Sequence, residues 1–291
     1  MPLPPDPRLL DPAVREREYS PSSVTGGTWR PFLARYVDES ARAWQTVPGT
    51  RGLRYGDAPR QTLDFFPAPP GTARAGLLVY IHGGYWQELS TAESAFLAPA
   101  WHAAGFAHAV VGYTLAPAAT VPAIVTECRA ALSWLHAHAA TLGFETENVV
   151  IAGSSAGGYL AAACADRSLA PVRGIVPVSG VFDVAPLIGT SINDALGLDA
   201  ATAARLDLLA PGRRFVPAVV AWGDIETTEF KRQSREFAAR LERDGTPCET
   251  LEVPGRNHFD VILELGDPST ALFAAARQLF ARWTHSGAGA T

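Results

Sequence analysis

Apolar residues in this chain are concentrated in short, largely uninterrupted runs of the length of a β-strand. From residue 62 onward, these runs are separated by longer stretches with helical or polar character. They lie at residues 62–66, 77–81, 107–111, 149–152, 174–178 and 216–222, and a further β-like run spans 249–253. Continuous apolar strands of this kind are typical of a parallel sheet that is covered on both faces.

One of the intervening stretches has a clear helical period. Between residues 121 and 140, apolar side chains recur at Ile124, Cys128, Ala131, Leu132, Leu135 and Ala139. This spacing predicts an amphipathic helix that crosses between the strands at 107–111 and 149–152. Because strands alternate with helices, the pattern predicts an α/β fold with a doubly wound, mostly parallel sheet.

Three segments fall outside this alternation. Residues 1–55 are rich in proline, arginine and aromatic residues, and we expect an N-terminal arm that packs on the main domain, with one short helix around 31–44. Residues 182–213 are too long for a simple crossover and predict a small helical cap, an insertion that usually shapes a substrate pocket. The main domain is expected to span 56–286, followed by a frayed tail at 287–291. The proline-rich arm is also compatible with a homodimer.

Composition and charge narrow the classes of function. The chain has 291 residues, of which 47% are hydrophobic, enough to bury a sizeable core. Its formal net charge of -5, without a cluster of lysine or arginine, argues against a nucleic-acid partner. The N-terminus does not resemble a signal peptide, and no apolar run has the length of a membrane span. We therefore expect no membrane association and a cytoplasmic location.

The cysteines and histidines give no indication of a metal site. Cys128, Cys164 and Cys248 are odd in number, widely spaced and without a C-x-x-C pair, which argues against a disulfide framework and a structural zinc site. The histidines lack i, i+4 pairing with carboxylates. We therefore expect neither a metal nor another cofactor.

A G-x-S-x-G motif at 153–157 lies directly after an apolar strand and before a helix-forming stretch. A strand that turns sharply into a helix holds its corner residue in a strained conformation, and the flanking glycines provide the room. The motif predicts Ser155 as a nucleophile at a helix N-terminus, where the backbone N–H of Ala156 would stabilise an oxyanion. By itself, the motif also fits a glycine-rich turn that has no function.

A second motif, His-Gly-Gly-Tyr-Trp at 82–86, follows the apolar run at 77–81. Two consecutive glycines allow the backbone to turn its N–H groups toward a bound carbonyl oxygen, so Gly83 and Gly84 are predicted to supply the rest of an oxyanion hole. His82 itself is expected to brace the loop. The two motifs together favour a serine hydrolase over a bare turn.

A serine nucleophile needs a histidine that accepts its proton and a third group that orients the imidazole. His258 lies in a loop after the run at 249–253 and follows the nucleophile in the chain, as the base does in α/β-hydrolases. The other histidines either precede the nucleophile or lie next to the tail; they are His82, His102, His108, His136, His138 and His285. His258 is therefore the predicted base.

The orienting acid is expected in the loop after the strand at 216–222, where two carboxylates compete. Asp224 has the commoner residue type but follows the end of the strand at once, whereas Glu226 lies deeper in the loop and has the reach to meet His258. We prefer Glu226 and keep Asp224 as the alternative. Asp183 is a weaker candidate because it follows the strand that precedes the cap. Asp260 is also weaker, because it is too close to His258 in the sequence to orient the imidazole easily.

Several motifs together resemble those of kynurenine formamidases (arylformamidases) of the α/β-hydrolase fold. The resemblance covers most of the chain and rests on His-Gly-Gly-Tyr-Trp-Gln at 82–87, Gly-Ser-Ser-Ala-Gly-Gly at 153–158, Glu-Phe-Lys-Arg-Gln-Ser at 229–234, His-Phe-Asp at 258–260 and Tyr-Ser-Pro-Ser-Ser at 19–23. Relative to the Glu-Phe pair at 229–230, the aspartate of the family's triad falls on Glu226. The resemblance thus favours Glu226 over Asp224, and glutamate has one methylene more than the aspartate of the family.

The resemblance implies hydrolysis of N-formylkynurenine to kynurenine and formate through a formyl-serine intermediate. The partner is then a small aryl amide or ester. Tyr85, Trp86 and Phe182 are candidates for lining a slot for the aryl ring, and Asn193 in the cap is a candidate for holding the amino-acid end of the substrate.

Two other functions remain compatible with these motifs. The same triad on the same fold cleaves other acyl bonds, so a carboxylesterase that acts on small aryl or short-chain esters is the main alternative. A catalytically inactive hydrolase fold that serves as a binding module is the second alternative. The intact nucleophile, base, acid and oxyanion loop argue against it, because a binding module needs none of them.

Overall fold

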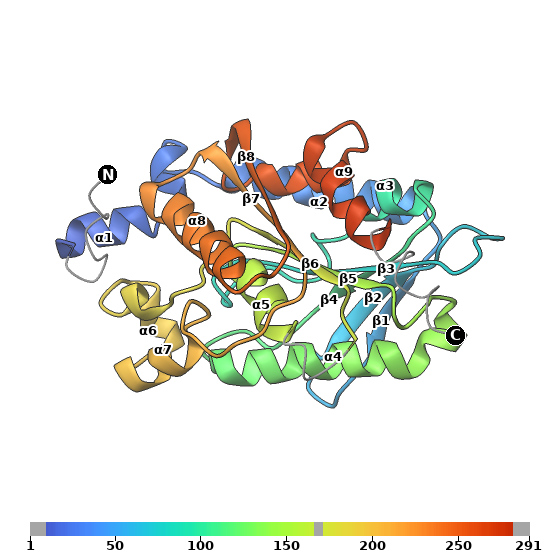
Figure 1. Ribbon diagram of the computed structural model, residues 1–291, viewed down its shortest axis with the longest axis horizontal. Helices are drawn as coiled ribbons and strands as arrows, with labels where there is room; N and C mark the ends of the chain where they lie inside the picture. Colours follow the sequence, from blue (N-terminus) through green and yellow to red (C-terminus); the bar gives the residue numbers. More distant parts are fainter. Residues whose placement is uncertain (1–9, 166–170, 282–291) are drawn as a thin grey trace.

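Eight strands form one sheet in the computed structural model, which describes residues 10–165 and 171–281 (Figure 1). In chain order they are β1 (Thr50–Arg54), β2 (Thr62–Phe66), β3 (Leu77–Ile81), β4 (Ala107–Val111), β5 (Val149–Ser154), β6 (Gly174–Val178), β7 (Ala218–Ile225) and β8 (Cys248–Asn257). The order across the sheet is β1-β2-β4-β3-β5-β6-β7-β8. The first two pairings are antiparallel and all later ones are parallel. The predicted doubly wound, mostly parallel α/β sheet is thereby confirmed.

The helices flank this sheet. They are α1 (Pro12–Glu18), α2 (Arg30–Thr46), α3 (Ala98–Ala103), α4 (Val121–Leu142), α5 (Ala156–Cys164), α6 (Asn193–Leu196), α7 (Ala200–Leu206), α8 (Thr228–Arg243) and α9 (Ala271–Ala281). Short 3-10 helices span Pro21–Val24, Ala185–Leu187 and Val261–Gly266. The predicted crossover helix at 121–140 is confirmed as α4, which ends two residues later at Leu142.

The alternation of side chains along the strands builds two hydrophobic cores, one on each face of the sheet. In β3, Leu77, Val79 and Ile81 join the core that includes residues of α4, α5 and α8, whereas Leu78 and Tyr80 join the core beneath α2, α3 and α9. Figure 1 shows these two groups of helices on opposite sides of the sheet. Burial on both faces explains why the central strands read as continuous apolar runs.

The sheet begins earlier in the chain than the sequence suggests. The edge strand β1 lies inside the segment 1–55 that was expected to be an arm, and it pairs antiparallel with β2. Only Leu53 of this strand is partly buried, so the strand carries no run of apolar residues. The rest of the described arm, with α1 and α2, packs on the domain, and α1 lies beside α8 (Figure 1).

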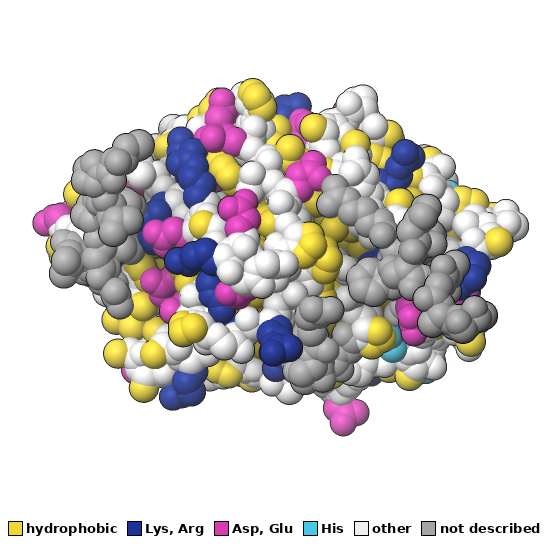
Figure 2. Space-filling model, viewed as in Figure 1, with side chains coloured by type: hydrophobic (Ala, Val, Ile, Leu, Met, Phe, Trp, Pro, Cys, Tyr) yellow, Lys and Arg dark blue, Asp and Glu magenta, His cyan; other side chains and the backbone are white. Residues whose placement is uncertain are grey.

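The segment 182–213 is helical in short pieces, namely the 3-10 helix at Ala185–Leu187, α6 and α7. The predicted tail at 287–291 lies outside the described residues. On the face shown in Figure 2, acidic and basic side chains are interspersed, so this face carries both signs of charge. None of the helices within residues 10–165 and 171–281 is long and apolar enough to cross a membrane.

Two buried histidines make the stability of this fold sensitive to acid. His108 lies in β4 with its Nδ1 atom 3.1 Å from the carbonyl oxygen of Leu78, and burial lowers its pKa to about 3. Burial likewise lowers the pKa of His82 to about 4. In the unfolded chain both groups take up a proton below their ordinary pKa of 6.5, but in the folded protein they do so only below their lowered pKa values.

We therefore expect the free energy of unfolding to fall by about 2 kcal/mol for each of these histidines as the pH drops from about 7 to about 5. His108→Asn removes one titrating group and keeps an N–H for the Leu78 carbonyl. Between about pH 7 and about pH 5, the variant should therefore lose about 2 kcal/mol less stability than the wild type. Urea unfolding at each pH measures the difference, and an unchanged pH dependence in the variant would contradict the explanation.

Candidate active site

Ser155 lies at the corner between β5 and α5 in a strained backbone conformation. Its φ of 57° and ψ of -122° fall in a region that non-glycine residues rarely adopt. The turn is tight because a β-carbon on Gly157 would lie 2.0 Å from the carbonyl oxygen of Ile81, and one on Gly153 would lie 2.1 Å from that of Gly157. This is the geometry of a nucleophile elbow, which presents a serine hydroxyl at the carboxyl end of a parallel sheet.

Glu226 and His258 meet at the same end of the sheet, immediately after β7 and β8. The Nδ1 atom of His258 lies 2.9 Å from Oε2 of Glu226, and both side chains are buried. An Nδ1–H that donates to this carboxylate leaves Nε2 as the nitrogen able to accept a proton. Asp224 does not take part, because its exposed carboxylate accepts a hydrogen bond from the Gly255 N–H at 2.7 Å.

The other oxygen of Glu226 is held by two donors. Its Oε1 accepts hydrogen bonds from the Ser179 hydroxyl and from the Gly223 N–H, both at 2.6 Å. Hydrogen bonds to the charged form offset the cost of burying a carboxylate. Sequence reasoning missed Ser179, and the one available signal was its position directly after the apolar run at 174–178.

The His-Gly-Gly loop lies against the nucleophile. A β-carbon on Gly83 would be 2.6 Å from the Ser154 carbonyl oxygen and 3.2 Å from the Ser155 Cβ, so only glycine permits this approach. The hydroxyl of Tyr113, which sequence reasoning also missed, lies 2.9 Å and 3.1 Å from the carbonyl oxygens of His82 and Gly83. These contacts fix the orientation of the loop's peptide groups.

Further features of the loop agree with a bracing role for His82 and with an oxyanion site nearby. His82 is fully buried, stacks on Tyr113 with ring centroids 4.2 Å apart, and places its Nδ1 atom 3.0 Å from the Gly83 carbonyl oxygen. Gly84 adopts a φ of 87°. As the first residue of α5, Ala156 has no carbonyl acceptor within the helix for its N–H.

A cavity of about 320 Å³ opens onto Ser155 and His258, a volume typical of a small-molecule site. Its wall comes from the His-Gly-Gly loop, from Ser191 and Ile192 of the cap segment and, to the largest extent, from the N-terminal arm. The arm residues that line it are Tyr19, Ser20, Pro21, Ser22, Trp29, Phe32, Leu33 and Tyr36. The arm therefore contributes more of the wall than the cap, to which the sequence had pointed.

Of the four residues suggested for substrate binding, Tyr85 lines the cavity and the other three do not. Trp86 is fully buried and packs edge-on against Tyr159. Phe182 is also fully buried and stacks on Phe237. These suggestions were wrong because a position near a strand end does not determine whether an aromatic ring turns toward the core or toward the pocket.

Asn193 has a structural role in place of the suggested contact with substrate. Its amide accepts a hydrogen bond from the Leu198 N–H at 2.8 Å and donates one to the Leu198 carbonyl at 3.1 Å. Both polar ends of the side chain are thereby used in closing the turn that follows α6. Within residues 10–165 and 171–281, no group of three or more His, Cys, Asp or Glu side chains is arranged to hold a metal ion.

This chain is similar to known proteins over most of its length. A model of the BD-FAE family matches residues 63–169. A kynurenine formamidase from Salmo salar is 30% identical over 271 residues, which cover 87% of this chain and 90% of that protein. A carboxylesterase/phospholipase, LipF of Mycobacterium tuberculosis, is 28% identical over 89% of this chain and 63% of its own length.

Among solved structures, a candidate thioesterase from Silicibacter sp. superimposes with a TM-score of 0.80 and 26% identity, over 90% of this chain and 98% of that one. This likeness over most of the chain, together with the mostly parallel eight-stranded sheet, confirms the α/β-hydrolase fold. The relatives are hydrolases that act on acyl bonds, and the chain is accordingly a serine hydrolase. On the strength of the match along nearly its whole length, this chain belongs to the kynurenine formamidase family.

Proposed function

We propose that Ser155, His258 and Glu226 form a catalytic triad that hydrolyses an aryl formamide, with N-formylkynurenine as the substrate. The observation that carries the proposal is the contact of 2.9 Å between His258 and the buried Glu226 carboxylate, at the cavity onto which the strained Ser155 also opens. A neutral imidazole oriented in this way is the base that a serine hydroxyl requires.

The first half of the reaction transfers the formyl group to the enzyme. Nε2 of His258 takes the proton from the Ser155 hydroxyl as Oγ attacks the formyl carbon. The N–H groups of Gly83, Gly84 and Ala156 stabilise the oxyanion of the tetrahedral intermediate. The carbon–nitrogen bond then breaks, His258 gives its proton to the departing aniline nitrogen, and Ser155 is left as a formyl ester.

The second half returns the enzyme to its starting state. His258 takes a proton from water, whose oxygen attacks the formyl ester, and the same oxyanion donors stabilise the second intermediate. Collapse of that intermediate breaks the ester bond. His258 returns its proton to Ser155 Oγ, and formate leaves. Throughout the cycle, Glu226 keeps the imidazole in one orientation and stabilises its protonated form.

The relatives and the cavity support an aryl amide as the substrate. A relative named as a kynurenine formamidase matches over most of both chains. The pocket also presents aromatic rings from two directions, with Tyr85 on the oxyanion loop and Trp29, Phe32 and Tyr36 on the arm. Flat aromatic side chains of this kind suit the ring of an aniline leaving group.

A carboxylesterase that acts on small aryl esters is the second candidate function. It is favoured by the similarity to LipF, which is named as a carboxylesterase and phospholipase. The proposed triad and oxyanion donors would serve an ester as well as an amide, since both pass through a tetrahedral intermediate.

Two further expectations stay predictions. A cytoplasmic location agrees with three free cysteines, of which Cys128 and Cys164 are buried and Cys248 is partly buried. The proline-rich arm is compatible with a homodimer.

Ser155→Ala should abolish covalent labelling by a small fluorophosphonate and lower kcat by a factor on the order of 10⁵ to 10⁶, because no other group can take the acyl moiety. The label is read by intact-protein mass spectrometry and kcat by release of the aniline or phenol. Circular dichroism of the variant checks that it is folded. A folded wild-type protein that takes up no label would instead support the binding module.

Glu226→Gln should lower kcat on the order of 10⁴-fold, because an amide does not hold the imidazole in the required tautomer. Asp224→Asn is the matched control, since this neighbouring carboxylate is exposed and bonds to the Gly255 N–H. We expect the control to keep activity within a few fold of the wild type. The opposite ranking of the two variants would assign the acid to Asp224.

Substrate preference distinguishes the two candidate functions. We expect kcat/KM for N-formylkynurenine to exceed that for p-nitrophenyl acetate, although the ester is chemically the easier substrate, because the cavity would bind the formamide's larger leaving group. Rates are followed by the absorbance of kynurenine and of nitrophenol under the same conditions. A preference for the ester by orders of magnitude would overturn the formamidase assignment and leave the esterase.

A further inference from the structure

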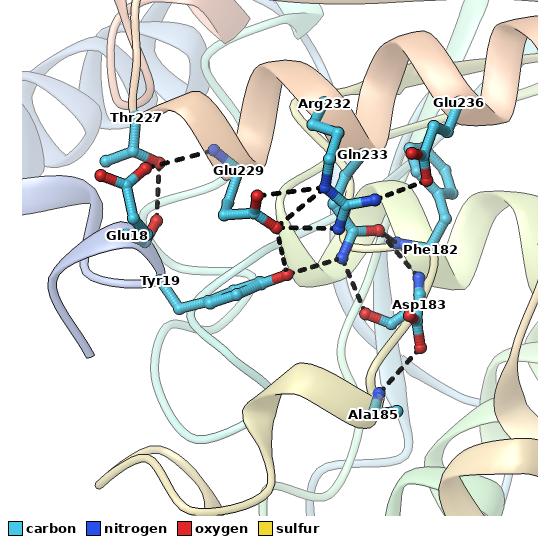
Figure 3. Close-up of polar contacts among 10 residues, drawn as sticks. All are labelled: Glu18, Tyr19, Phe182, Asp183, Ala185, Thr227, Glu229, Arg232, Gln233 and Glu236. Carbon is cyan, nitrogen blue, oxygen red and sulfur yellow. Dashed lines mark hydrogen bonds and ion pairs between the residues drawn. The ribbon is translucent and has the colours of Figure 1, made fainter. Parts of the chain in front are cut away.

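Two of the motifs that resemble kynurenine formamidases lie more than 200 residues apart in the chain and meet in the structure. Tyr19 opens the Tyr-Ser-Pro-Ser-Ser motif of the arm, and its hydroxyl donates to Oε2 of Glu229 at 2.9 Å. The same hydroxyl accepts a hydrogen bond from Nε2 of Gln233 at 3.2 Å. Glu229 and Gln233 both belong to the Glu-Phe-Lys-Arg-Gln-Ser motif at the start of α8 (Figure 3).

The contact is built into the core of the protein. Tyr19 and Gln233 have no exposed surface, and Glu229 is 5% exposed. Burial, together with the charge of Glu229, raises the pKa of Tyr19 well above its usual value, so the hydroxyl keeps its proton and remains a donor. A buried tyrosine hydroxyl that bonds to a carboxylate forms a charge-assisted contact, which is stronger than one between neutral groups.

Neighbouring side chains hold the two partners of Tyr19 in place. Arg232 forms a forked pair with Glu229, in which its Nη2 lies 2.8 Å from Oε2 and its Nε lies 3.1 Å from Oε1. Gln233 accepts hydrogen bonds from the N–H groups of Phe182 and Asp183, both at 2.8 Å, and donates to the Asp183 carbonyl. Figure 3 shows how this network surrounds the end of the Tyr19 side chain.

The docked segment also contacts the loops that carry the proposed triad. The Thr227 hydroxyl, one residue after Glu226, donates to the Glu18 carbonyl at 2.6 Å. The Tyr85 hydroxyl, on the oxyanion loop, donates to the Tyr19 carbonyl at 2.5 Å. The arm is thus attached beside Glu226, through Thr227, and at the oxyanion loop (residues 82–86), through Tyr85. The side chain of Tyr19 lies between these two attachments.

Beyond this point the arm continues as one wall of the cavity. Trp29, Phe32, Leu33 and Tyr36 all line it, and Phe32 stacks on Phe259 beside the proposed base, with ring centroids 5.4 Å apart. In the proposed reaction, the leaving group of a substrate attached at Ser155 would lie in this same cavity. The formyl group itself is too small to need such a wall.

We propose that Tyr19 is a specificity-determining positioning residue, whose docking on Glu229 and Gln233 fixes the arm as the wall that binds the aromatic leaving group. The inference rests on the proposed function, in that it takes the cavity at Ser155 as the substrate site. Tyr19 touches none of the reacting atoms in this scheme. It acts by placing the aromatic residues of the arm, so its loss changes the binding of an aryl substrate more than the chemical step.

Tyr19→Phe tests the proposal with the removal of one oxygen atom. We expect KM for formanilide and p-nitrophenyl acetate to rise about fivefold, since the buried hydrogen bonds of the Tyr19 hydroxyl to Glu229 and Gln233 are lost, while kcat stays within about twofold. For ethyl acetate, which has no ring in its leaving group, kcat/KM should be unchanged. Hydrogen exchange of amides in residues 30–46 should become faster, because the arm separates more readily from α8.

Two other variants make the result interpretable. Tyr55→Phe is the matched control, because Tyr55 is a partly buried tyrosine whose hydroxyl donates to the Gly112 carbonyl at 2.7 Å and which does not line the cavity. It should leave both KM values and exchange in the arm at wild-type levels. Thr227→Val removes the attachment of the arm beside Glu226 and should act in the same direction as Tyr19→Phe.

The possible results separate this proposal from the assignment of the active site. An equal loss of kcat on all three substrates would overturn it, since Tyr19 would then position the triad and not the wall. Unchanged KM values in Tyr19→Phe, with or without faster exchange, would also overturn it. Labelling of Ser155 by a fluorophosphonate reports on the triad independently, so failure of the wild type to react would count against the proposed function alone.

Discussion

The strained turn at Ser155 is the constraint on which the rest of the site depends. A left-handed φ at a non-glycine residue costs on the order of 1–3 kcal/mol and persists only where surrounding contacts enforce it. Here the Ser155 N–H donates to the Val178 carbonyl at the end of β6, and Gly157 packs against the backbone at the end of β3. These contacts hold the turn and bring the ends of three neighbouring strands together. The residue after Val178 is Ser179, which bonds to Glu226, and the loop after β3 carries Gly83.

The second requirement is a buried carboxylate with hydrogen-bond donors around it. A desolvated carboxylate is costly, but Glu226 receives donors from three directions: the imidazole of His258, the hydroxyl of Ser179 and the N–H of Gly223. Strand β7 extends to Ile225, so the acid projects directly from the end of a strand and not from a long loop.

Comparison of sequence and structure separates what a local pattern encodes from what depends on packing. The central strands were predictable because burial on both faces leaves a continuous apolar run, and the motifs around Ser155 and Gly83 were predictable because sharp turns need glycine. The edge strand β1 was not, since only Leu53 is partly buried. Ser179 and Tyr113 were also missed, because a serine or tyrosine after a strand acquires its role only from the neighbouring strand or loop. The wrong suggestions for Trp86 and Phe182 have the same origin, since the direction of a ring is decided by tertiary contacts.

The size of the proposed acyl group determines which part of the chain can select the substrate. A formyl group occupies little space beyond the oxyanion donors. The residues at the ends of the strands, which would carry out the chemistry, therefore cannot distinguish one formamide from another. Discrimination must then come from the leaving group, whose ring would face the arm.

The arm is a separate piece of chain, tied to the domain by a buried polar network at Tyr19 and by Thr227. Selectivity in this architecture is therefore decided where the arm docks, and reactivity is decided at the ends of the strands.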